Sequence, residues 1–121
     1  MKHRKTSRQL GRVRKQRVAL WRTMLGSLII NGRIVTTEAK AKELKPRIDR
    51  VITKAKRALE REGGGRRLAV YQIQKDIPAP AVRKLLADMD RFRDRDSGYT
   101  RIVKITPRRG DAAKMALIEF V

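Results

Sequence analysis

The first 37 residues contain ten lysines and arginines and no aspartate or glutamate, since the first carboxylate is Glu38. The rest of the chain carries 22 basic and 12 acidic residues, so half of the net charge of +20 lies in less than a third of the length. A chain so charged repels itself unless an anionic partner neutralises it. The sequence therefore predicts a basic segment attached to a more balanced domain, with nucleic acid or another anionic surface as the partner.

Composition excludes several classes of protein. A chain of 121 residues has room for one compact domain, and 40% apolar residues are too many for a wholly disordered basic tail. With no cysteine and one histidine, His3, the chain cannot assemble thiolate metal sites, disulfides or histidine-based catalytic groups. The longest mainly apolar stretch, Leu25 to Ile30, is far shorter than the roughly 20 residues of a membrane span, and no signal peptide is visible. We expect a soluble intracellular domain without catalytic site, metal or cofactor.

The spacing of apolar residues predicts an α+β domain. Residues 1–9 hold one apolar side chain, so we expect a basic arm that RNA orders, followed by a single domain over residues 10–121. Apolar residues three and four apart predict a helix from Leu10 to Asn31, which Gly32 ends. A strand over 33–36 follows, and then a helix that Thr36 or Thr37 caps and that kinks or restarts at Pro46.

Glycine and proline punctuate the second half of the chain. The glycines 63–65 break the helix, a short helix follows near residues 68–73, and another begins at Pro80. Residues 99–106 and 115–121 alternate as strands do, and residues 107–111 form the tip of the hairpin between them. The predicted order is helix, strand, three helices and two strands. We expect the helices to pack on one small mixed sheet.

The basic arm and the start of the first helix are the strongest candidates for a binding site, because their cations have no acidic neighbour in sequence. Phosphate neutralisation is the function that they predict, since each contact releases counterions and makes affinity depend on salt. A solvated basic face is the plainer alternative. The candidate residues are His3, Arg4, Lys5, Arg8, Arg12, Arg14, Lys15 and Arg17.

The predicted hairpin is the second candidate. Arginines stand at its tip and glycines flank its first strand, where backbone N–H groups could approach phosphates. An ordinary turn that needs glycine, with a tyrosine at the edge of the core, is the alternative. The candidate residues are Tyr99, Thr100, Arg101, Arg108 and Arg109.

Three other functions have to be weighed. Asp88, Asp90, Asp94 and Asp96 could suggest a metal-dependent phosphodiesterase, but the arginines between them favour local ion pairs on a solvated helix end. Charge alone leaves structured RNA and duplex DNA nearly tied, so a nucleoid-type DNA-binding protein is the main alternative. A membrane-active cationic helix over residues 10–30 is a weaker third, because an α+β domain surrounds it.

A series of short motifs occurs in an order that is specific, although each motif alone is weak. They are His3-Arg4-Lys5, Arg8-Gln9-Leu10, Thr36-Thr37, Lys40-Ala41-Lys42-Glu43-Leu44, Arg66-Arg67-Leu68, Gly98-Tyr99-Thr100-Arg101-Ile102, Arg109-Gly110-Asp111 and Met115-Ala116-Leu117-Ile118-Glu119. Together they cover essentially the whole chain. In residues and order the set resembles the family of ribosomal protein seventeen of the bacterial large subunit.

The resemblance implies a structural, non-enzymatic constituent of the large ribosomal subunit in the cytoplasm. It implies binding to large-subunit rRNA of the 23S type, neighbouring ribosomal proteins near the nascent-chain exit region, and a role in subunit assembly and translation, with no membrane or small-molecule substrate. A bacterial ribosome and a bacterial-type organellar one fit equally. A-form RNA hides its base edges in a deep groove, so recognition would rest on shape and backbone. The motifs add Lys40, Lys42, Arg66 and Arg67 to the expected rRNA contacts.

Overall fold

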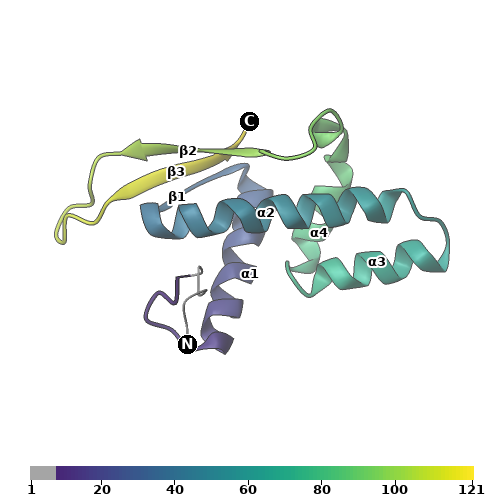
Figure 1. The fold of residues 1–121 in the computed structure, drawn as a ribbon, viewed down its shortest axis with the longest axis horizontal. Coiled ribbons are helices and arrows are strands. Elements are labelled where there is room, and N and C mark those ends of the chain that lie inside the picture. Colours follow the sequence, from purple (N-terminus) through teal and green to yellow (C-terminus); the bar gives the residue numbers. More distant parts are fainter. Residues whose placement is uncertain (1–7) are drawn as a thin grey trace, which may run out of the picture.

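The computed structural model describes residues 8–121. Figure 1 shows α2 along the length of the molecule, with the sheet beside its first half and α3 beside its second half. This α+β arrangement confirms the predicted fold class. In chain order the elements are α1 (Arg14–Asn31), β1 (Arg33–Thr37), α2 (Glu38–Leu59), α3 (Gly64–Gln74), α4 (Ala79–Ala87), the 3-10 turn η1 (Met89–Phe92), β2 (Thr100–Ile105) and β3 (Met115–Phe120).

Helix α1 starts later than its apolar pattern predicts. Leu10 and Gly11 have φ angles of 54° and 65°, so a left-handed turn replaces the expected first turn of helix. Leu10 still packs against the core. It therefore continues the apolar spacing of α1 in the sequence, although it lies before the helix begins. The predicted end is confirmed: Gly32 adopts a φ of 79° and its N–H bonds to the carbonyl of Leu28.

Helix α2 forms the centre of the fold. Thr37 is its N-cap and accepts a hydrogen bond from the backbone N–H of Lys40, and Glu38 in the first turn complements the helix dipole. The helix runs unbroken through Pro46, so of the two predicted outcomes there the restart is wrong, and the kink stays a prediction. The missing N–H of a proline removes one bond, but Leu44 and Ile48 on either side are fully buried and hold the helix to the core.

The sheet is antiparallel throughout, in the order β1-β3-β2, and not mixed as predicted. Both outer strands pair with β3, with Ile34 and Ile102 opposite Ile118. Since opposite residues share a face, these three side chains lie together toward the helices. The hairpin between β2 and β3 makes these two strands antiparallel. On the other side of β3, β1 also pairs with it in the antiparallel direction.

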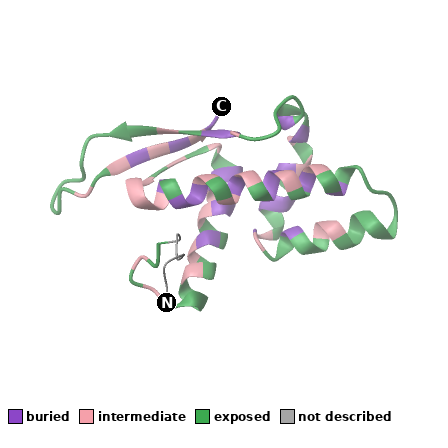
Figure 2. Ribbon diagram, viewed as in Figure 1, coloured by how far each residue is buried: buried purple, intermediate pink, exposed green. Residues whose placement is uncertain are grey.

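The core lies between the helices and the inner face of the sheet. Figure 2 shows buried residues along α2 and β3 and an almost wholly exposed α3. In α3 the buried residue is Ile73, whereas Leu68 and Tyr71 of the predicted helix are exposed. Near the C-terminal strand, the ring of Phe92 packs on Tyr99 and Phe120 with centroid distances of 5.6 and 5.2 Å.

Two helices approach each other unusually closely where α1 crosses the start of α4. A Cβ atom built on Gly26 would lie 2.8 Å from Cδ of Pro78. Glycine is therefore the residue that allows this crossing. Among residues 8–121, no helix has the length and apolar character needed to cross a membrane.

Candidate nucleic-acid interface

The basic arm is attached to α2 at the point where the described chain begins. Arg8 donates to Oε1 of Glu43 from its backbone N–H at 3.2 Å and from its guanidinium at 2.9 Å. Glu43 is only 9% exposed, so this pair fixes the chain on the buried side of α2. The sequence offered no acidic neighbour for Arg8, because its partner lies 35 residues away. His3, Arg4 and Lys5 lie outside the described residues.

The start of α1 concentrates cations where a helix favours anions. Arg14 and Lys15 are exposed in the first turn, which contains no acidic residue, and Val13 provides no side-chain cap. Unpaired N–H groups and the positive end of the helix dipole add to this charge. Nearby, Arg12 donates to the carbonyl of Leu10, and Arg17 donates to the carbonyl of Arg12. This end of α1 is therefore chemically suited to an anion.

The lysines of the Lys40–Leu44 motif lie in the first turns of α2. Lys42 forms an ion pair with Glu38 at 2.9 Å, and Lys104 from β2 lies 3.7 Å from the same carboxylate. The hydrogen bond from Lys42 holds the pKa of Glu38 below its usual value, and the charges of Lys42, Lys104 and Lys114 act in the same direction. Lys40 is half-buried and forms no ion pair within residues 8–121.

Arg66 and Arg67 are adjacent in sequence but differ in role. The guanidinium of Arg66 donates to the carbonyls of Leu59 at 2.8 Å and Arg61 at 2.9 Å, so it satisfies the C-terminal end of α2. Arg67 is exposed on α3. Figure 1 places α3 and the β2–β3 loop at opposite ends of the molecule. The predicted contact residues are thus distributed along the whole length of the fold rather than gathered at one point.

Two of the predicted contact residues are buried. Tyr99 is 1% exposed and its hydroxyl donates to the carbonyl of Arg95 at 2.8 Å, while its backbone N–H donates to Asp49. Thr100 is 3% exposed. The ring of Tyr99 belongs to the core, as the alternative interpretation supposed, and Thr100 is a buried polar residue beside it. We therefore leave them out of the contacts proposed below.

The loop between β2 and β3 spans residues 106–114 and is longer than the predicted tip. Arg108 forms two hydrogen bonds to the carboxylate of Asp111, at 2.6 and 3.2 Å, which closes the loop. Together with the backbone N–H of Ala113, Arg108 lowers the pKa of Asp111 from 3.8 to about 2, and the same bonds raise the pKa of Arg108. Arg109 is exposed and has no ion pair among the described residues.

Arg101, the predicted contact residue on the sheet, faces a carboxylate of the next strand. Arg101 on β2 donates to Glu119 on β3 at 2.8 Å, and the two residues lie opposite each other in the register. The local ion pairs expected in the aspartate-rich segment are present, as Arg93 to Asp90 at 2.6 Å shows. No group of three potential metal ligands is found in the part of the chain that the structure describes.

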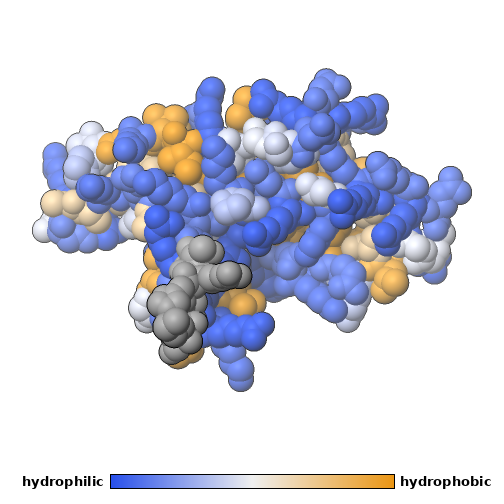
Figure 3. All heavy atoms as spheres, in the orientation of Figure 1, coloured by the Kyte–Doolittle hydropathy of each residue, from blue (hydrophilic) through white to orange (hydrophobic). Residues whose placement is uncertain are grey.

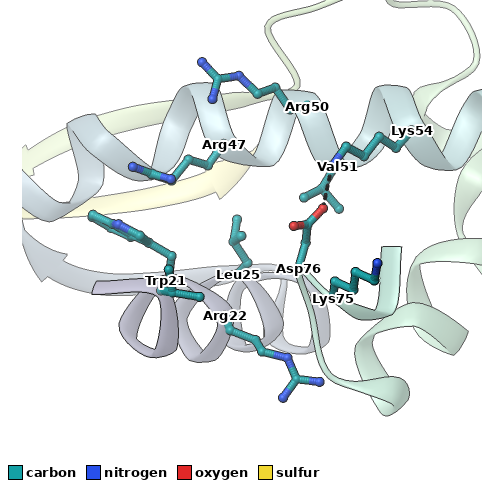
Figure 4. A pocket seen from close by; sticks show the side chains of 10 residues that line it. Trp21, Arg22, Leu25, Arg47, Arg50, Val51, Lys54, Lys75 and Asp76 are labelled. Atoms are coloured by element: carbon teal, nitrogen blue, oxygen red, sulfur yellow. Dashed lines mark hydrogen bonds and ion pairs between the residues drawn. The ribbon is translucent and has the colours of Figure 1, made fainter. Parts of the chain in front are cut away.

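The sequence prediction missed one group of cations altogether. Arg22 on α1 and Arg47 and Arg50 on α2 line a cavity between the two helices, which Figure 4 shows from close by. Arg47 and Arg50 are three residues apart, so they share a helix face, and this spacing was the available signal. Their nearness to α1 depends on how the helices cross, which the sequence pattern does not give.

The surface as a whole is polar and basic. In Figure 3 hydrophilic side chains cover most of the visible face, with small apolar patches between them. Eight of the described lysines and arginines form ion pairs, and the larger number do not. The fold and its charge define a small α+β protein whose surface favours polyanions.

Comparison with known proteins identifies the family. The profile described as ribosomal protein L17 matches residues 20–121. Large ribosomal subunit protein bL17 of Shouchella clausii is 49% identical over 119 residues, covering 93% of this chain and 97% of that protein. The bL17 proteins of Exiguobacterium sibiricum and Gemmatimonas aurantiaca are 47% and 46% identical, covering 93% and 100% of this chain and 97% and 98% of theirs. The chain belongs to the ribosomal protein L17 family, which confirms the resemblance seen in its motifs.

Proposed function

We propose that this protein is a structural, non-enzymatic constituent of the large ribosomal subunit in the cytoplasm, and that it binds 23S-type rRNA. The main parts of the binding surface are the N-terminal basic segment, the start of α1 and the β2–β3 loop, and α2, α3 and β2 add further contacts. The observation that carries the proposal is the acid-free first turn of α1. There, Arg14 and Lys15 add charge to the positive end of the helix, an arrangement that a bound anion would stabilise.

The proposed contact residues are the predicted basic residues that are accessible at the surface or that lie in the N-terminal segment. Phosphate groups of the RNA backbone accept hydrogen bonds from them and lose condensed counterions in exchange. Because the contacts are spread over the length of the molecule, the protein reads the shape of folded RNA rather than a short sequence. The proposed set is His3, Arg4, Lys5, Arg8, Arg12, Arg14, Lys15, Arg17, Lys40, Lys42, Arg66, Arg67, Arg101, Arg108 and Arg109.

Binding by both ends of the fold also supports a role in subunit assembly. The basic segment, residues 1–9, is anchored to α2 through Arg8. It can follow RNA helices while the domain stays in place, and so hold separate RNA segments together. We propose that neighbouring large-subunit proteins near the exit region lie beside this site. Deleting residues 2–9 should leave the domain folded but sharply reduce incorporation into the large subunit, measured by sedimentation through a high-salt wash. Normal incorporation of the shortened chain would contradict the proposed role of the arm.

A pair of charge-matched variants tests the start of α1. In Arg14→Gln/Lys15→Gln, the slope of log affinity for 23S-type rRNA against log salt should fall by roughly 0.7–0.9 for each lost phosphate contact. The control, Lys84→Gln/Arg93→Gln, removes the same charge at positions that already have carboxylate partners. Equal slopes for the two variants would contradict the assignment of α1. Duplex DNA that competes as well as rRNA at matched salt would instead favour a nucleoid-type protein.

A further inference from the structure

The cavity between α1 and α2 lies apart from the surfaces discussed so far. It has a volume of about 210 Å³, and its walls come from α1, α2 and the segment after α3. Figure 4 shows Trp21 and Leu25 on one side, Arg47 and Val51 on the other, and Asp76 between them. Three separate parts of the chain therefore form its walls.

The charge of the cavity is strongly positive. The one acidic residue of its lining, Asp76, is bound to Lys54 at 2.7 Å, drawn as the dashed line in Figure 4. The other charged residues of the lining, Arg22, Arg47, Arg50 and Lys75, form no ion pair within residues 8–121. Arg22 and Arg50 are exposed at the rim, where their long side chains can turn toward a ligand.

Two residues that line this cavity, Trp21 and Arg47, each carry a buried N–H group without a hydrogen-bond partner among the described residues. Trp21 is 5% exposed, and its indole Nε1 has no hydrogen-bond partner among the described residues. The guanidinium of Arg47 lies over the Trp21 ring, 4.6 Å from its centroid, and its buried Nε also has no partner there. Buried polar groups are nearly always paired, because leaving one unpaired costs free energy. Both groups are donors, so the missing partner is an acceptor.

We propose that this cavity binds a phosphate group of the RNA backbone, whose oxygens accept hydrogen bonds from Trp21 and Arg47. The proposal rests on the RNA-binding function proposed above and adds a site to it. A phosphate oxygen is an acceptor and an anion, so it meets both requirements of the cavity at once. An apolar ligand would leave the donors unpaired, and a cation would be repelled. An RNA base is disfavoured because Arg47 already covers the Trp21 ring.

The chain contains a built-in probe for this site, because Trp21 is its one tryptophan. In a ¹H–¹⁵N NMR spectrum of the full chain, a single indole signal reports on the proposed hydrogen bond. We expect inorganic phosphate to move this signal saturably, and sodium chloride of equal ionic strength to leave it in place. A synthetic A-form RNA hairpin should move the signal in the same direction at far lower concentration, since further contacts hold it to the surface.

Variants separate this site from general loss of charge. Arg47→Gln should abolish the phosphate response, whereas Arg57→Gln, which removes the same charge at an exposed position of α2 outside the cavity, should preserve it. Trp21→Phe keeps an aromatic ring and removes the donor. It should weaken binding to the RNA hairpin by about tenfold, the value of one hydrogen bond to a charged group, with an unchanged far-ultraviolet circular dichroism spectrum.

Each other result overturns the inference in a recognisable way. An indole signal that stays in place while the RNA hairpin binds would refute the phosphate site and leave the proposed function intact. A signal that moves with an acidic peptide and not with RNA would assign the cavity to a carboxylate of a protein partner. Failure of the hairpin and of 23S-type rRNA to bind at all would refute both proposals.

Discussion

Replacing Gly26 with alanine measures how much the close crossing of α1 and α4 constrains the sequence. Gly26 lies inside α1, where alanine is favoured over glycine by about 1 kcal/mol of helix propensity. Against this gain, the new Cβ would lie 2.8 Å from Cδ and 3.1 Å from Cγ of Pro78. Carbon atoms in contact normally lie about 3.5–4.0 Å apart. The proline ring is rigid and precedes α4, so it cannot turn aside.

The two effects can be compared in magnitude. Forcing one carbon into a packed site costs typically about 1–3 kcal/mol, which exceeds the propensity gain. We therefore expect Gly26→Ala to lower the free energy of unfolding by about 1 kcal/mol net, or the melting temperature by about 4 °C for a domain of this size. Urea unfolding of the full chain, followed by circular dichroism at 222 nm, measures the change.

The matched control is Gly65→Ala in α3. A Cβ at Gly65 would meet only the Arg61 side chain at 3.8 Å, an ordinary contact, and the backbone there is helical. This substitution should raise the free energy of unfolding by about 0.5–1 kcal/mol. The two alanine variants are thus expected to change stability in opposite directions. If Gly26→Ala stabilised the protein as much as Gly65→Ala does, the argument from close packing would be refuted.

Three further predictions concern charged side chains. Glu43→Gln should lower the free energy of unfolding by about 1–2 kcal/mol, because it weakens the half-buried pair with Arg8. NMR should then show faster hydrogen exchange of the Arg8 backbone amide. Asp111 has a lowered pKa, so its contribution to stability is present above pH 3.8 and is lost as the pH falls through about 2. The melting temperature of Asp111→Asn should therefore fall less over that interval than that of the unmodified chain. Arg109→Gln should reduce the slope of log affinity for rRNA against log salt by roughly 0.7–0.9. The control Lys84→Gln removes a cation that is already paired with Asp88, so it should leave the slope unchanged.

Local signals in the sequence predicted most of the fold. Asn31-Gly32 and Thr37 fix the C-terminal end of α1 and the start of α2 through contacts between near neighbours, and those predictions are confirmed. The errors occur where distant contacts override the local pattern. Pro46 breaks an isolated helix, but buried neighbours on both sides keep α2 continuous. Whether the sheet is mixed or antiparallel depends on the direction in which β1 pairs with β3, about 80 residues away. No local sequence pattern determines that direction.

The candidate site was predictable to a similar extent. Cations such as Arg14 and Lys15 were predicted as contacts because they have no acidic neighbour in the sequence, and the structure places both on the surface. Tyr99 was placed among the contacts because its motif suggested it, yet its ring lies in the core. The partner of Arg8 and the cavity beside Trp21 were missed for one reason. Both join residues that are far apart in the chain, so only the packed fold brings them together.

The order β1-β3-β2 has a consequence for how a newly made chain reaches this structure. The middle strand is the last of the three along the chain, and neither outer strand pairs with the other. While the polypeptide is still being synthesised, β1 is available long before its partner, and its unpaired backbone must wait for about 80 further residues. The helices can pack in the meantime, because their contacts lie closer together in sequence. The sheet then closes in a single late step, and a chain interrupted before residue 115 would present two unpaired strand edges to its surroundings.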